Sequence, residues 1–139
     1  MKTVKLTPEQ LEELSDLKKK LRNPDLKELL TRAIENWKIY PAKQTTFGTK
    51  CKNDKIQFLD DARGCCLIGA GIIGREIRSL DYILDAVVDT YHLNENQMEI
   101  ITNTFDGNDD FVKEQLLQNQ SDMFLFFDVE RIRKVVFGE

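Results

Sequence analysis

The stretch that decides the fold is GCCLIGAGIIGREI, residues 64–77. It is apolar on almost every side, and a helix with apolar residues all round its axis belongs inside a core rather than on a surface. We therefore predict a buried, glycine-rich helix over residues 64–77 at the centre of the molecule. Its small residues would let neighbouring helices approach closely.

The same stretch supports an alternative, because Gly69, Gly71 and Gly74 have the spacing G-x-G-x-x-G. That motif binds the phosphates of a dinucleotide when it follows a strand and opens a helix, so residues 65–68 would have to be a strand in a parallel sheet. The upstream residues are predicted to be helical, and residues 80–91 have helical periodicity where a second strand should lie. A packed helix is the favoured interpretation, and a nucleotide-binding protein or enzyme using residues 69–74 is the alternative.

Upstream of this stretch, the sequence predicts the starts of two helices. Thr7 and Asn23 are capping residues, each followed by a proline at the first helical position. Gln10 is placed to complete a capping box with Thr7. Apolar residues then recur at helical spacing, most regularly from Leu26 to Trp37. We predict two helices that form a hairpin.

Downstream, further helices follow in close succession. Ser79 would cap a helix over residues 80–91, Asn94 and Gln97 form a capping box, and Gly107 ends that next helix. Later helices are predicted to bury Phe111, Val112, Leu116, Leu117, and then, after a cap at Ser121, Leu125, Val129, Ile132 and Val136. Residues 123–127 are apolar throughout and could instead begin as a strand. The fold class is mainly α: one domain, residues 1–139, a compact bundle of about six helices.

Between residues 40 and 63 the helical periodicity disappears, which predicts a long basic loop that could hold a short β-hairpin, with a strand at residues 55–59. Cations beside aromatic rings can hold a phosphate or a stacked base. The candidate site for an anionic ligand is Trp37, Tyr40, Lys43, Lys50, Lys52 and Arg63, and nucleic acid would bind along residues 37–63. A polar loop whose aromatic residues pack back on the core is the favoured alternative.

Composition limits the class of protein. The chain has 139 residues, 41% hydrophobic and 32% charged, which suits a folded domain. No apolar run approaches the roughly 18 residues that a membrane span needs. The amino terminus lacks the apolar region of a secretory signal, so we expect a cytoplasmic protein.

The charge is unevenly distributed along the chain. Residues 1–78 carry 16 Lys and Arg against 11 Asp and Glu, or +5, whereas residues 79–139 carry 4 against 13, or −9. Such asymmetry can steer a charged partner, or it can let the two halves attract each other on folding, and the second interpretation is favoured.

Catalytic groups are hard to find in this sequence. Cys51, Cys65 and Cys66 lack a zinc-binding spacing, and we expect free thiols with a raised pKa in the apolar run at Cys65 and Cys66. The single histidine, His92, follows the helix over residues 80–91 and is expected to interact with its dipole. We assign no catalytic residue, no metal site and no cofactor.

One family resemblance is visible in the order Cys65–Ala70, an amphipathic helix, Gln97, Ile100–Ile101 and Phe105–Asp106. It resembles small uncharacterised domains of bacteria and their phages, in which a Cys-x-Leu-Gly-Ala helix precedes an Ile-x-x-Trp/Phe-Asn-Asp turn. The match covers residues 60–117 and departs from the pattern, since Ile68 is inserted before Gly69 and residues 105–107 replace Trp-Asn-Asp. The resemblance implies a helical fold and a viral or mobile-element setting, hence the host cytoplasm, with no known activity.

Together these features predict a non-enzymatic accessory binding protein. It would contact a macromolecular partner, such as a protein, or sequester a small anionic ligand, because catalytic groups are missing while charge asymmetry and a basic aromatic loop are present. A homo-oligomer subunit is a third alternative.

Overall fold

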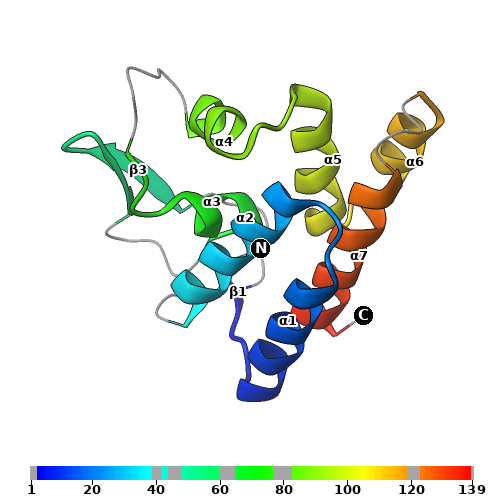
Figure 1. Cartoon of the computed structure of the whole chain (residues 1–139), viewed down its shortest axis with the longest axis horizontal. Coiled ribbons are helices and arrows are strands. Elements are labelled where there is room, and N and C mark those ends of the chain that lie inside the picture. Colours follow the sequence, from blue (N-terminus) through cyan, green and yellow to red (C-terminus); the bar gives the residue numbers. More distant parts are fainter. Residues whose placement is uncertain are drawn as a thin grey trace.

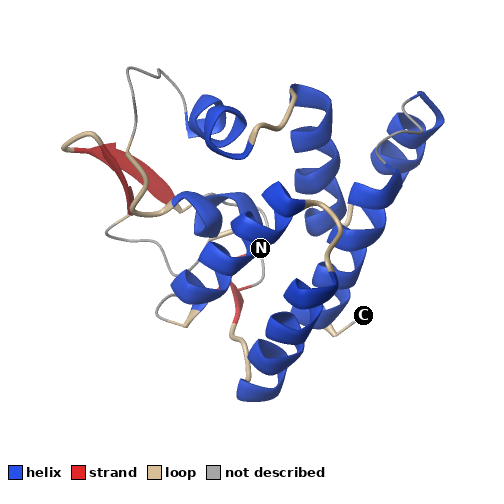
Figure 2. Ribbon diagram, viewed as in Figure 1, coloured by secondary structure: helices blue, strands red, loops and turns tan. Residues whose placement is uncertain are grey.

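The computed structural model describes residues 3–38, 42–43, 48–59, 65–76, 83–118 and 123–138. These residues form seven helices and two small antiparallel sheets, which confirms the predicted mainly α fold (Figures 1 and 2). The helices are α1 (Pro8–Lys20), α2 (Pro24–Trp37), α3 (Leu67–Ile72), α4 (Ile83–Tyr91), α5 (Glu95–Asp106), α6 (Asp109–Gln118) and α7 (Met123–Phe137). The strands are β1 (Thr3–Val4), β2 (Ala42–Lys43), β3 (Thr49–Lys52) and β4 (Lys55–Phe58).

The first two helices begin where the caps predict. The Thr7 hydroxyl accepts a hydrogen bond from the Gln10 backbone N–H at 3.2 Å, and the Gln10 side chain accepts one from the Thr7 N–H at 2.7 Å. Asn23 caps α2 by accepting hydrogen bonds from the N–H groups of Asp25 and Leu26. α1 packs against α2, and α2 buries one continuous apolar face: Leu26, Leu29, Leu30, Ala33, Ile34 and Trp37.

The central glycine-rich helix is present and buried, but it is shorter than predicted. α3 has six residues, all buried, and ends at Ile72; residues 64 and 77 lie outside the described part of the chain. Gly74 has φ +86°, a left-handed conformation that glycine adopts without strain. Its N–H donates to the Ile56 carbonyl at 2.6 Å, and the Ile56 N–H donates to the Arg75 carbonyl at 3.0 Å. Pairing with the hairpin therefore replaces the next helical turn.

That hairpin confirms and extends the predicted strand at residues 55–59. β3 and β4 pair antiparallel, with Lys52 opposite Lys55. The two residues between them, Asn53 and Asp54, have φ +53° and +62°. Positive φ at both central residues characterises the type I′ turn, whose twist matches that of the flanking strands.

α3 is held by its two neighbouring helices. The Asn36 side chain on α2 donates to the Ala70 carbonyl at 2.5 Å, and the Tyr91 hydroxyl on α4 donates to the Gly71 carbonyl. α2 makes the most extensive packing with α3, as Figure 1 shows for the ribbons. These two hydrogen bonds hold α3 against both α2 and α4.

The carboxyl half follows the predicted order. The Asn94–Gln97 capping box opens α5, and Gly107 ends it with φ +84°. α7 packs against α5 and α1 and is helical from Met123, so the strand alternative for residues 123–127 is wrong. The predicted caps Ser79 and Ser121 lie outside the described residues.

Candidate functional site

The structure places the predicted basic aromatic site only in part. Trp37, the last residue of α2, is buried; its indole N–H donates to the Cys65 carbonyl at 3.3 Å, and its ring stacks on Phe105 with centroids 5.9 Å apart. A ring enclosed in this way cannot stack on a ligand, so Trp37 belongs to the core. The favoured alternative, an aromatic packed back on the core, holds for this residue.

The remaining members of that site are spread over separate segments. Tyr40 and Arg63 lie outside the described residues, and Lys43 lies on the short strand β2. Lys50 and Lys52 both lie on β3, two residues apart, so they share a face of the strand; Lys50 is half-buried and Lys52 is exposed. In the described part of the chain, only these two lysines are brought close together by one element.

The glycine motif does not have the geometry of a dinucleotide loop. Gly69 and Gly71 lie inside α3, Leu67 and Ile68 are helical rather than a strand, and the described sheets are two-stranded and antiparallel. Gly71 faces the Leu29 side chain, and the Gly74 N–H donates a hydrogen bond to Ile56 in the hairpin. In this structure Gly71 serves close helix packing and Gly74 a turn.

The cysteines have the environment of structural residues. All three are free thiols; Cys51 is exposed, and Cys65 and Cys66 are buried. Burial raises the pKa of Cys66 to about 11 and raises that of Cys65 further, as predicted from the apolar run. No group of three or more potential metal ligands is found among the described residues.

The most distinctive surface lies where α6 ends and α7 begins. Successive residues on a helix are rotated by about 100°, so five consecutive apolar residues cannot all face one core. Leu125 is buried with Val129, Ile132 and Val136, as predicted. Met123, Phe124 and Phe127 are consequently turned outward, with 41%, 61% and 43% of their surfaces exposed.

A fourth exposed apolar side chain, Leu117, lies near the end of α6. It is 81% exposed, so the prediction that it is buried is wrong, whereas Val112 is buried as predicted. Phe111 and Leu116 are half-buried. We call Leu117, Met123, Phe124 and Phe127 the apolar face; these are the large apolar side chains that are exposed among the described residues. In Figure 1, α6 lies at the end of the molecule opposite the hairpin.

One charged side chain contacts the apolar face. The Arg22 guanidinium lies over the Phe124 ring, 5.2 Å from its centroid, in a cation–π contact. On α6, Asp109, Asp110 and Glu114 are exposed. The sequence contains one indication of this surface, the run of five apolar residues at 123–127. In a helix, five consecutive residues point in different directions, so several of these side chains cannot face the core.

No helix in the described part of the chain is long and apolar enough to cross a membrane. The resemblance to bacterial and phage domains stays a prediction. No known protein family, curated protein or solved structure matches this chain.

Proposed function

We propose that this protein is a non-enzymatic accessory protein that binds a protein partner through its apolar face. The observation that carries the proposal is the outward orientation of Phe124 and Phe127 on a well-packed helix whose opposite side is buried. Burying one such aromatic side chain contributes about 2 kcal/mol, so a partner that covers both gains substantial affinity.

The composition of the apolar face supports protein binding. Aromatic residues and methionine are enriched in the centres of protein interfaces, and methionine adapts to irregular partner surfaces. Leu117 alone would be unremarkable, because single exposed apolar residues are common. Four large apolar side chains close together in the sequence, at 117 and 123–127, are characteristic of a recognition surface.

The charge of the carboxyl-terminal half of the chain suggests the chemistry of the partner. Asp109, Asp110 and Glu114 are exposed on α6, and residues 79–139 carry 13 acidic against 4 basic side chains. An apolar segment flanked by lysine or arginine is electrostatically complementary to this surface. Steering by opposite charges also predicts that association slows as salt concentration rises.

Site-specific photocrosslinking tests the proposal directly. A benzophenone-bearing phenylalanine replaces Phe124 or Phe127 in the full chain, and the native cells are irradiated. The control carries the same group at Glu99, an exposed position on α5. We expect a protein adduct from positions 124 and 127 that is absent from position 99.

The affinity of the crosslinked partner segment for variants of this protein then tests whether Phe124 and Phe127 contribute to binding. The crosslinked segment of the partner is mapped by mass spectrometry and synthesised as a peptide, and its affinity is measured with Phe124→Ala, Phe127→Ala and the control Lys27→Ala. Truncating an interface aromatic often costs more than 1.4 kcal/mol, so each phenylalanine variant should bind about tenfold or more weakly. Lys27 is exposed on α2, and its variant should bind like the wild type.

Other adducts would contradict the proposal. Adducts between copies of this chain alone would make the apolar face a self-association surface, and lipid adducts would make it a membrane contact. A mapped segment without basic residues would overturn the stated partner chemistry.

A further inference from the structure

A polar depression of about 540 Å³, which shares no residue with the apolar face, lies between α2, the turn after α3 and the end of α4. Arg32 contributes to its lining from α2, Gly74 and Arg75 from the turn, and Asp89 and His92 from α4 and the residue that follows it. These residues come from three separate parts of the sequence, and the packing of α2, α3 and α4 brings them together.

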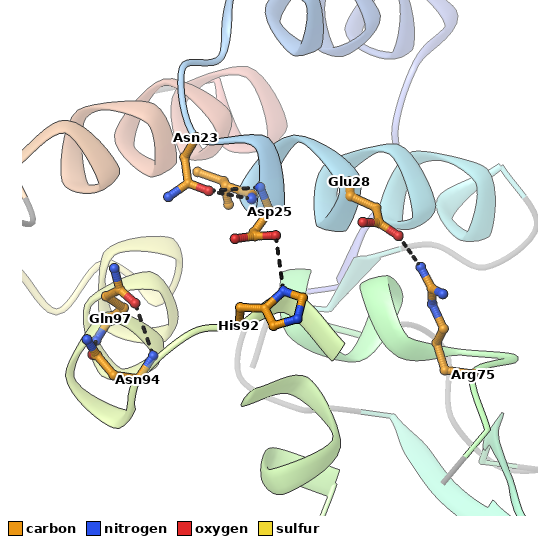
Figure 3. A network of polar contacts seen from close by, with 8 residues as sticks. Asn23, Asp25, Glu28, Arg75, His92, Asn94 and Gln97 are labelled. Atoms are coloured by element: carbon orange, nitrogen blue, oxygen red, sulfur yellow. Dashed lines mark hydrogen bonds and ion pairs between the residues drawn. The ribbon is translucent and has the colours of Figure 1, made fainter. Parts of the chain in front are cut away.

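Two polar contacts with α2 lie at the walls of the depression, and the one made by Arg75 is an ion pair (Figure 3). His92, directly after α4, has its Nδ1 atom 3.6 Å from Asp25 Oδ1, and Arg75 has its Nη2 atom 2.6 Å from Glu28 Oε1. Asp25 and Glu28 are three residues apart on α2, so they occupy one face of the helix. The Arg75 guanidinium also lies over the Tyr91 ring, 5.7 Å from its centroid. Arg75 is therefore held on two sides.

Arg32 lies on the same face of α2, four residues after Glu28, but in the described part of the chain its side chain is not paired as those of Asp25 and Glu28 are. Among the described residues, its guanidinium makes no hydrogen bond or ion pair, and its Nε atom is buried without a hydrogen-bond partner. The Nε atom of Arg75 is likewise buried without one. Protein atoms enclose both Nε atoms, so a ligand in the depression would bind the terminal Nη atoms of the two guanidinium groups.

Gly74 keeps the space beside Arg32 open. A Cβ atom at this position would lie 3.8 Å from Arg32 Nη2, and no side chain of the described residues occupies that place. The turn brings backbone rather than a side chain next to the guanidinium. A ligand could therefore reach Arg32 without displacing a neighbouring group.

The depression also contains carboxylates. Asp89 and Glu76 line it and are both exposed. These carboxylates weaken the binding of a simple anion, whereas a ligand with hydroxyl or ammonium donors at its other end gains an attractive contact from them. Arginine binds phosphate and carboxylate groups with two parallel hydrogen bonds, which suits the anionic end.

We propose that this depression binds a small molecule whose phosphate or carboxylate group is held by Arg32 and Arg75 and whose hydroxyl or ammonium groups face Asp89 and Glu76. This site is independent of the apolar face. It is also distinct from the basic loop in which the sequence predicted an anionic ligand.

Nuclear magnetic resonance of the arginine side chains provides the test. Inorganic phosphate, acetate and phosphoethanolamine are each titrated into the full chain, and the Nε–Hε signals of Arg32 and Arg75 are followed. Sodium chloride at matched ionic strength reports general screening. We expect saturable shifts of both signals, larger for whichever oxyanion the site prefers, and tighter binding of phosphoethanolamine than of phosphate because its ammonium group meets the carboxylates.

Two variants test the assignment. Arg32→Gln should weaken phosphoethanolamine binding by about tenfold or more, because a charge-assisted hydrogen bond is lost. Lys27→Gln removes the same charge from an exposed position of the same helix and should leave the affinity nearly unchanged. If Arg32→Gln does not fold, the wild-type signals of Arg32 and Arg75 still decide the question.

Three results would overturn the proposal: shifts that sodium chloride reproduces, shifts that do not saturate with any of the three compounds, or equal weakening by Lys27→Gln. The Phe124→Ala variant is expected to bind phosphoethanolamine like the wild type. Failure of the partner experiment and failure of this one are therefore distinguishable.

Discussion

Leu29 of α2 packs against Gly71 of α3 on the side where residue 71 has no side chain. A Cβ atom there would lie 3.0 Å from Leu29 Cγ and 3.2 Å from the Leu29 carbonyl oxygen. The second glycine of the G-x-G-x-x-G spacing is thus explained by the contact between two helices. A bulky substitution such as Gly71→Val would therefore disturb the core. Loss of nucleotide binding in that variant would not show that residues 69–74 bind the nucleotide.

This contact predicts that Gly71→Ala is destabilising. Overpacking a tight contact typically costs about 1–3 kcal/mol, and the Leu29 backbone cannot move as a flexible side chain can. Urea unfolding should show the loss directly. In a Leu29→Ala background the same substitution should cost less, because part of the obstacle has been removed. A Gly71→Ala protein as stable as the wild type would refute the packing described for this contact.

The hydrogen bond from Tyr91 to the Gly71 carbonyl gives a second prediction. Tyr91→Phe keeps the buried ring and its contact with Arg75 but removes the hydroxyl donor. The Gly71 carbonyl then loses that partner, which should lower the free energy of unfolding by about 1–3 kcal/mol. Thermal unfolding followed by circular dichroism measures the effect, and an unchanged midpoint would show that this bond contributes nothing to stability.

Asp106 should make stability depend on pH. Burial raises the pKa of its carboxyl from 3.8 to about 6, so between about pH 4 and 6 the folded state binds more protons than the unfolded state. Its contribution to stability is therefore present below pH 4 and is lost as the pH rises through 6. Asp106→Asn should remove this dependence and gain stability relative to the wild type at pH 7. Urea unfolding of both proteins across this range tests the sign.

Thiol reactivity should separate the three cysteines. Cys51 is exposed, whereas Cys65 and Cys66 are buried with raised pKa values. At about pH 8, the native protein should react with one equivalent of a disulfide reagent quickly, and with three after denaturation. Cys51→Ser should abolish the fast phase. Rapid reaction of a second thiol in the folded protein would contradict the burial of Cys65 and Cys66.

The hairpin turn predicts a stabilising substitution. Asp54 has φ +62° at the second central position of the type I′ turn, where glycine is preferred. Asp54→Gly should raise stability by up to about 1 kcal/mol, whereas Asp54→Val should lower it, because β-branched residues adopt positive φ poorly. Comparison of the two melting temperatures with that of the wild type tests the turn type. A higher melting temperature for Asp54→Val would exclude it.

Local chemistry made several boundaries predictable. The starts of α1, α2 and α5 follow from Thr7, Asn23 and Asn94, because a cap and its partners lie within three residues of each other. The end of α5 follows from Gly107 for the same reason. Burial at Leu125 and Val129 follows from helical periodicity. The exposure of Leu117 could not be predicted in this way, because it depends on where the end of α6 lies relative to the other helices.

The sequence by itself therefore determined the helical class, most helix starts and a buried glycine-rich centre, because these depend on neighbours three or four residues away. Only the tertiary structure decided that α3 stops at Ile72, since Gly74 bonds to Ile56 in a distant hairpin. It also decided that Arg32, Arg75 and His92 border one depression. Those outcomes depend on which elements pack together, and no local pattern specifies the partner of a helix face.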